Sequence, residues 1–171
     1  TPCGTLFPYT TLFRSDVEGV FDLIEREDIP RACFYHLAYS GRGSQMVAED
    51  LSPAETRRIV DLIIDRTAEL HERGTPREVL TVASHVDGPY LYLRMLREGN
   101  PRAEQVMELL RMNGGNSTGL GIGAVSWDGT VYPDQFWRNR PLGNVREKPF
   151  SEIWTDVSDP PEETRFSAGV K

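Results

Sequence analysis

Apolar side chains recur at helical spacing in the first regular part of the chain, residues 16–28. Four of them share one helical face: Val17, Val20, Phe21 and Ile24. The spacing predicts an amphipathic helix, which Pro30 ends. Residues 31–37, RACFYHL, follow as a short apolar and aromatic run that is typical of a buried strand. A loop over residues 40–43 comes next.

The clearest predicted helix covers residues 53–73. Ser52 is its N-cap, Pro53 occupies the first helical position and Glu55 completes a capping box. Gly74 ends it. Charged residues fill one side, and the other carries an apolar stripe: Ile59, Ile63 and Leu70, with Val60 and Leu62 beside them.

Residues 79–84, VLTVAS, predict a second buried strand. Asp87 then begins a helix through YLYLRMLRE, which is apolar on most sides and is therefore expected to be largely buried. A strand over residues 90–93 is the alternative. Asn100 begins another helix, which ends near residue 113 and has four inward positions: Ala103, Val106, Met107 and Leu110.

The apolar period changes from Gly119 onward. The runs GLGIGAVSW and TVYPDQFW flank Asp128 and Gly129, a pair of residues that strongly favours a β-hairpin. A short helix is expected near residues 151–154, and the polar tail after Ser158 is expected to be loose.

The order helix, strand, helix, strand, helix predicts an α/β fold with a parallel sheet and crossover helices. The hairpin does not fit that order and begins a second, smaller module. We therefore divide the chain into residues 16–115 and 116–171. From the residues alone, the prediction is an α/β half-barrel with a candidate anion-binding edge.

Residues 1–15 differ from the rest because they contain no acidic residue and no regular period. Residues 5–15, TLFPYTTLFRS, resemble a translated sequencing adapter, so we expect a non-native scar and leave it out of the fold prediction. A short ordered N-terminal strand is the alternative. If the scar is real, the true N-terminus is missing and the chain is a fragment.

Composition narrows the possible functions. The 171 residues carry a net charge of −7, which argues against a nucleic-acid or anionic-membrane surface. No apolar stretch is long enough to cross a membrane. The two cysteines, Cys3 and Cys33, cannot form a disulfide framework or a four-thiolate metal site, so no metal ligand is assigned.

Two of the three histidines fall where parallel strands end. His36 and His85 each follow a predicted strand and precede a glycine-bearing loop. Ligands of parallel α/β folds bind at this edge, and neighbouring strands would let both imidazoles face one cavity. The alternative is two histidines that only cap loops. His71 lies on the charged side of its helix and is expected at the surface.

Three other features are candidate functional sites, and each also has a purely structural interpretation. The loop Ser40-Gly41-Arg42-Gly43 can hold a carboxylate or phosphate, or it is an ordinary surface turn. Cys33 is expected to be a buried thiol rather than a nucleophile. Asp134 is a ligand or a turn cap, and the aromatic residues after it, Phe136 and Trp137, are expected to pack.

Three blocks carry a family resemblance: residues 34–43 (FYHLAYSGRG), 79–93 (VLTVASHVDGPYLYL) and 121–156, which contains the hairpin and SEIW. They resemble the NirJ family of radical S-adenosylmethionine proteins in haem d1 biosynthesis and the related haem synthases. The resemblance implies a partial (β/α) radical S-adenosylmethionine barrel, of which this chain holds the C-terminal part, followed by the β-hairpin start of a SPASM-like extension. It covers residues 16 to about 159.

The resemblance also implies chemistry. A 4Fe-4S cluster and S-adenosylmethionine would generate a radical that attacks a propionate side chain of an iron-containing tetrapyrrole, with a ferredoxin or flavodoxin as electron donor, in the cytoplasm. It places a set of residues at the cavity: His36 and His85 to orient a propionate or shuttle a proton, and Ser40, Gly41, Arg42 and Asp87 to bind the cofactor or a carboxylate.

The departures from the family concern the metal. The cluster motif CxxxCxxC is absent, and Asp134 stands where SPASM proteins usually have a cysteine. We therefore expect this chain alone to retain no cluster and to be inactive. Two other functions stay open: a fragment of a peptide-modifying radical SPASM enzyme, and a cluster-free α/β ligand-binding module.

Overall fold

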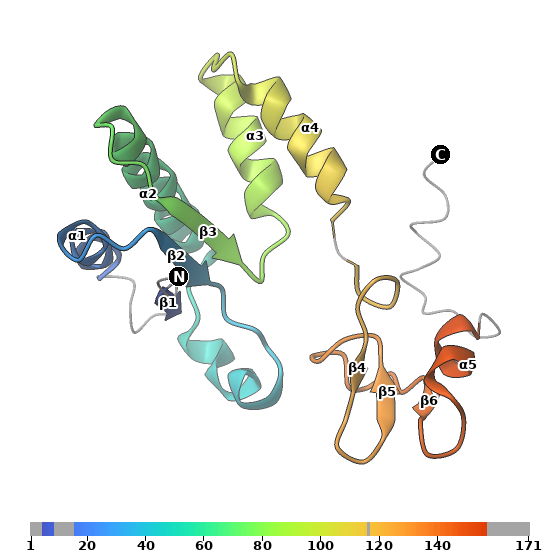
Figure 1. Ribbon diagram of the computed structural model, residues 1–171. Coiled ribbons are helices and arrows are strands. Elements are labelled where there is room, and N and C mark those ends of the chain that lie inside the picture. The colour runs from blue at the N-terminus through green and yellow to red at the C-terminus, as the bar shows by residue number, and fades with distance from the viewer. Residues whose placement is uncertain (1–4, 9–15, 116, 157–171) are drawn as a thin grey trace. The chain divides into compact units, whose positions relative to one another are not determined.

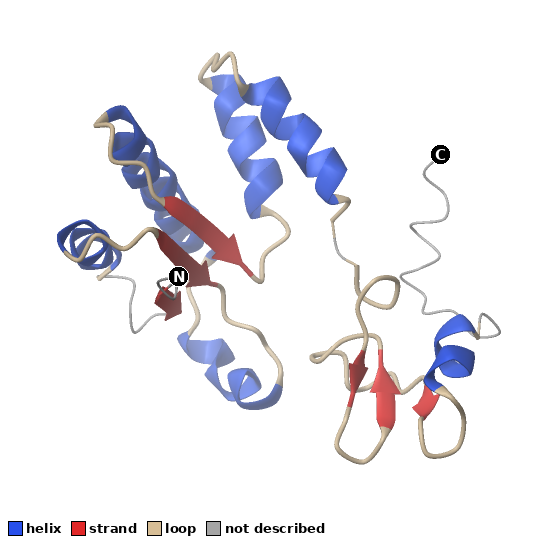
Figure 2. Cartoon of the chain, viewed as in Figure 1, coloured by secondary structure: helices blue, strands red, loops and turns tan. Residues whose placement is uncertain are grey.

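The computed structural model describes residues 5–8, 16–115 and 117–156 (Figure 1). The chain divides into two compact units, Thr1–Asn113 and Gly114–Lys171. The first is mixed α/β and the second is built around a small antiparallel sheet (Figure 2).

The first unit contains the predicted parallel sheet. Its strands are β1 (Thr5–Pro8), β2 (Arg31–Tyr35) and β3 (Glu78–Val82), in the order β1-β2-β3. Both pairs are parallel, with Ala32 opposite Val79. Strand β1 is the short N-terminal strand that the sequence left open as an alternative. The adapter prediction concerns the origin of that segment and stays a prediction.

Helices α1 (Val17–Arg26) and α2 (Pro53–Glu72) build the core on one face of the sheet. The buried side chains come from both helices and from β2: Val17, Phe21, Ile24, Ala32, Phe34, Leu51, Ile59, Ile63 and Leu70. The rings of Phe21 and Phe34 stack with centroids 5.5 Å apart. The predicted capping box of Ser52 and Glu55 is present, so both helix predictions are confirmed.

The expectation that both strands are buried on both faces is wrong. Along β2 exposure alternates, and β3 has no buried residue. On the sheet face opposite the core, Tyr35 is 36% and Leu80 is 40% exposed, and Cys33 is half-buried rather than buried. The cause is one-sided packing, because the core cluster covers only the face that carries Ala32 and Phe34.

The segment after β2 is more ordered than the predicted loop. Residues Gly41–Glu49 form a 3₁₀ helix, η1. Gly43 is required here by packing, since a Cβ at this position would lie 2.0 Å from the carbonyl oxygen of Ala38. Gly43 of the predicted anion loop therefore has a structural role.

Helices α3 (Asp87–Arg97) and α4 (Ala103–Asn113) pack on each other. The helix prediction for α3 is confirmed, and the strand alternative for residues 90–93 is wrong. Its predicted burial is also wrong, because α3 has no buried residue and α4 buries only Ala103. Four large apolar side chains of this pair are exposed: Leu93, Leu96, Leu109 and Met112.

The second unit confirms the predicted hairpin. Strands β4 (Ala124–Val125) and β5 (Thr130–Tyr132) pair antiparallel around Asp128 and Gly129, and β5 also pairs with β6 (Gly143–Asn144), which the sequence did not predict. The predicted short helix is α5 (Phe150–Thr155). Val131, Pro133 and Ile153 are buried, while Phe136 is 51% exposed, so the expectation that it packs is wrong.

Candidate functional site

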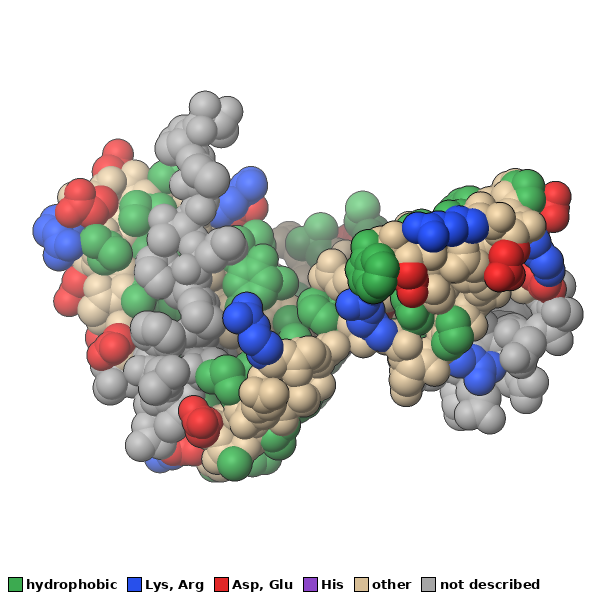
Figure 3. Space-filling view, turned by 90° about the horizontal axis from the view of Figure 1, so that it is seen from below, with side chains coloured by type: hydrophobic (Ala, Val, Ile, Leu, Met, Phe, Trp, Pro, Cys, Tyr) green, Lys and Arg blue, Asp and Glu red, His purple; other side chains and the backbone are tan. Residues whose placement is uncertain are grey.

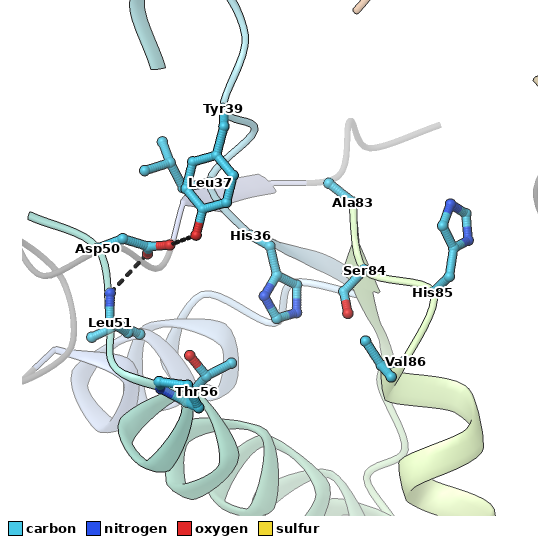
Figure 4. Close-up of a pocket in the computed structure, with 11 residues that line it drawn as sticks. His36, Leu37, Tyr39, Asp50, Leu51, Thr56, Ala83, Ser84, His85 and Val86 are labelled. Carbon is cyan, nitrogen blue, oxygen red and sulfur yellow. Dashed lines mark hydrogen bonds between the residues drawn. The ribbon is translucent and has the colours of Figure 1, made fainter. Parts of the chain in front are cut away.

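The carboxyl ends of β2 and β3 meet at one edge of the sheet, as predicted. The backbone N–H of His36 donates to the carbonyl oxygen of Val82 at 3.0 Å and extends the pairing beyond β2. A cavity of about 510 Å³ opens there (Figure 4). Side chains from three segments line it: His36, Leu37 and Tyr39 after β2; Asp50, Leu51, Pro53 and Thr56 around the start of α2; Ala83, Ser84, His85 and Val86 after β3.

His36 and Asp87 form a part-buried pair beside this cavity. His36 Nε2 lies 2.7 Å from Asp87 Oδ2, and the side chains are 16% and 13% exposed. The Ser84 hydroxyl donates to Asp87 Oδ1 at 2.8 Å. Burial raises the pKa of Asp87, but hydrogen bonds from His36, Thr81 and Ser84 outweigh it, so the net shift is downward. An ionised Asp87 makes Nε2 of His36 the donor.

His85 differs from His36 in exposure and direction. Both line the cavity, but His85 is exposed and its ring points away from His36 (Figure 4). The turn that carries it contains Ala83 at φ +67°, a conformation that is costly for a residue with a Cβ. The Ser84–Asp87 hydrogen bond spans this turn and helps to hold it.

The predicted anion loop lies outside the cavity lining. Ser40, Gly41 and Arg42 do not contribute to it, although Leu37 and Tyr39 just before them do. Arg42 is exposed, so its guanidinium is available to solvent. His71 is exposed, as predicted.

Tyr39 and Asp50 line the cavity, although the sequence did not predict them as site residues. The Tyr39 hydroxyl donates to Asp50 Oδ2, and Asp50 Oδ1 accepts from the backbone N–H of Leu51 at 2.8 Å. The hydrogen bond to Asp50, with burial, raises the pKa of Tyr39. Asp50 could have been predicted from its position just before Ser52, because the N-terminus of α2 lies at the same edge of the sheet.

Asp134, left open as ligand or turn cap, is a turn cap. Its Oδ1 accepts from the backbone N–H groups of Phe136 and Trp137, both at 2.7 Å, and its Oδ2 accepts from the Thr118 hydroxyl at 2.8 Å. Burial raises the pKa of this carboxyl, but the three hydrogen bonds outweigh burial and lower it.

The chain is similar to known proteins over most of its length. Residues 119–160 match the model of the SPASM family, described as an iron–sulfur cluster-binding domain. The chain is 65% identical over 156 residues to Fe-coproporphyrin III synthase of Methanosarcina barkeri, and 34% identical over 155 residues to pre-heme d1 synthase of Dinoroseobacter shibae. These alignments cover 91% and 89% of this chain.

The predicted resemblance to the radical S-adenosylmethionine haem-synthesis proteins is confirmed. The chain spans 38% of the length of each of these relatives. No solved structure matches it.

The residues present do not fit an iron–sulfur cluster. The SPASM match over residues 119–160 contains no cysteine, and the carboxylate of Asp134 is occupied by three hydrogen bonds. Within residues 5–8, 16–115 and 117–156, no three His, Cys, Asp or Glu side chains gather as a metal site would require.

On the face shown in Figure 3, side chains of both charges are interspersed with hydrophobic ones. None of the described helices combines the length and apolar character that crossing a membrane requires.

Proposed function

We propose that this chain is part of a radical S-adenosylmethionine enzyme that modifies carboxylate side chains of an iron tetrapyrrole in haem biosynthesis. The observation that carries the proposal is the 65% identity to Fe-coproporphyrin III synthase. Pre-heme d1 synthase is matched over the same 38% share of its length but at only 34% identity. The difference favours iron-coproporphyrin III as the product.

The sheet supports the finer proposal of a partial (β/α) barrel. Its strands follow one another in the order β1-β2-β3, and both core helices lie on one face. In a doubly wound sheet helices cover both faces, whereas in a barrel they stay outside. The opposite face, with Cys33, Tyr35 and Leu80, would then form part of the barrel interior.

We assign roles to the side chains at the carboxyl edge of the sheet according to their exposure. S-Adenosylmethionine with a four-iron cluster would supply a carbon-centred radical in such an enzyme. The residues that the structure describes bring together no set of ligands for that cluster. Because His85 is exposed, we assign it to orient a substrate propionate. His36 and Asp87 hold the turn that carries it. Arg42, exposed in η1, would pair with a second carboxylate.

A chimera tests the proposal with the whole catalytic machinery present. This chain replaces the matching segment of the Methanosarcina barkeri synthase, and formation of iron-coproporphyrin III is measured under reducing conditions. We expect product. His85→Ala should lower kcat/KM by about tenfold or more, as the loss of one charged contact predicts. Arg111→Ala, on α4, is the matched control and should leave the rate unchanged.

The alternatives give different results. A chimera that is folded and loaded with iron but forms no product would contradict the proposal. Modification of a peptide instead would favour the peptide-modifying enzyme. Binding of a small anion without binding of a tetrapyrrole would favour the ligand-binding module. An unchanged Soret band of the added tetrapyrrole would show that it does not bind.

A further inference from the structure

We infer that Asp134 is a positioning residue that holds the hairpin unit in its fold without a metal, in a segment whose family is described as cluster-binding. The inference concerns residues 117–156 and does not depend on the proposed function. It starts from the mismatch between the SPASM match and its lack of any thiol.

The geometry shows what the carboxylate does. Pro133 is fully buried, so the backbone that carries Asp134 is fixed from one side. The two N–H donors of Phe136 and Trp137 converge on one oxygen, and the Thr118 hydroxyl occupies the other. The carboxylate therefore joins the segment before β4 to the segment after β5.

The turn formed in this way directs the chain back along the hairpin. Arg138 follows it at once, donates to the Ser126 hydroxyl at 2.7 Å and lies 5.6 Å from the centroid of the Tyr132 ring. A cation over an aromatic face is attractive. Asp134 thus positions the strip 136–138 across β4 and β5.

The remaining core of this unit is also apolar. Val131 and Ile153 are buried, and Gly123 lies so close to the Trp154 ring that a Cβ there would be 2.4 Å from it. Backbone packing against an indole and side-chain hydrogen bonds to backbone amides account for the fold of the described residues.

The test compares four forms of the whole chain: wild type, Asp134→Asn, Asp134→Ala and Asp134→Cys. Amide hydrogen exchange is followed by NMR in buffer with a metal chelator. Asparagine keeps an acceptor oxygen for both amides, so it should preserve the protection of Phe136 and Trp137. In the alanine and cysteine variants these two amides should exchange about tenfold faster, the effect of losing one net hydrogen bond.

Asp128→Ala is the matched control in the same hairpin. Asp128 Oδ1 accepts from the backbone N–H of Thr130 at 3.0 Å, so this variant should expose Thr130 and leave Phe136 and Trp137 protected. Iron content after anaerobic reconstitution is measured in parallel, and wild type should remain at background.

Three results would overturn the inference. The first is unchanged protection of Phe136 and Trp137 in Asp134→Ala. The second is a wild-type hairpin that loses its protected amides in chelator, and the third is uptake of iron that depends on Asp134. Neither readout uses enzyme activity, so failure here is separate from failure of the proposed function.

Discussion

His36 Nε2 lies 2.7 Å from Asp87 Oδ2, although 51 positions separate the two residues in the chain. The contact joins the end of β2 to the first turn of α3. It is possible because β2 and β3 are direct parallel neighbours, which brings their carboxyl ends to one edge. Ser84 adds a local hydrogen bond to the same carboxylate and so ties the intervening turn to it.

Replacing Asp87 with asparagine should weaken the fold in a pH-dependent way. The pKa of Asp87 is lowered in the folded protein, so its stabilisation is present above the ordinary carboxyl pKa and is lost as pH falls through the lowered value. At pH 7 we expect Asp87→Asn to reduce the free energy of unfolding by roughly 1.5–3 kcal/mol. Urea denaturation at pH 7 and near pH 3 measures the difference, which should shrink at the lower pH.

A double-mutant cycle with His36→Ala checks that the effect belongs to the pair. The two losses should not add, because Asp87→Asn removes the charge and His36→Ala removes the donor of the same hydrogen bond. Additivity within about 0.5 kcal/mol would contradict the pairing.

This edge was only partly predictable from the sequence. Strand endings and the parallel rule were enough to place His36 and His85 around one cavity. They could not give side-chain direction, which depends on the turn at Ala83 and on the Asp87 hydrogen bonds. Arg42 was grouped with them by proximity along the chain, but η1 carries it outside the cavity lining.

Ser52→Ala should reduce the free energy of unfolding by about 1 kcal/mol, because the N-cap hydrogen bond to α2 is lost. The Glu55 backbone N–H donates to Ser52 Oγ at 3.3 Å, and the Ser52 N–H donates to Glu55 Oε2 at 3.0 Å. Thermal or urea unfolding measures the loss. Ser52→Gly is the comparison, with an expected cost of only a few tenths of a kcal/mol. An unchanged free energy of unfolding in Ser52→Ala would contradict a stabilising role for the hydroxyl.

Gly123→Val should disrupt the hairpin unit. A Cβ at this position would lie 2.4 Å from Cζ3 and 2.6 Å from Cη2 of Trp154, so the indole must move. Overpacking of this kind costs about 1–3 kcal/mol. Near-UV circular dichroism of the tryptophans should change. Gly121→Ala is the control, because its nearest atom, Cβ of Ser117, lies at an ordinary 3.4 Å. An unaltered Gly123→Val spectrum would contradict the close packing.

Helical periodicity predicted where α3 and α4 lie but not what covers them. The apolar residues of α3 were expected to be buried because they occupy most sides of the helix. Burial also requires a second surface that covers the helix. A sequence pattern does not show whether another part of the chain provides that surface. Arg94 illustrates the difference: it links α3 to α2 through ion pairs with Asp61 and Asp65.

The double variant Leu93→Glu with Leu109→Glu should therefore leave the fold of this chain intact. The two leucines are 54% and 62% exposed, so the free energy of unfolding should change by no more than about 0.5 kcal/mol. Leu70→Ala is the contrast, since Leu70 is 1% exposed and its truncation should cost about 2–5 kcal/mol. The same double variant should reduce self-association in sedimentation velocity, because exposed apolar side chains promote contact between molecules. A loss of stability comparable to that of Leu70→Ala would mean that α3 and α4 bury these leucines, and would restore the burial that the sequence predicted.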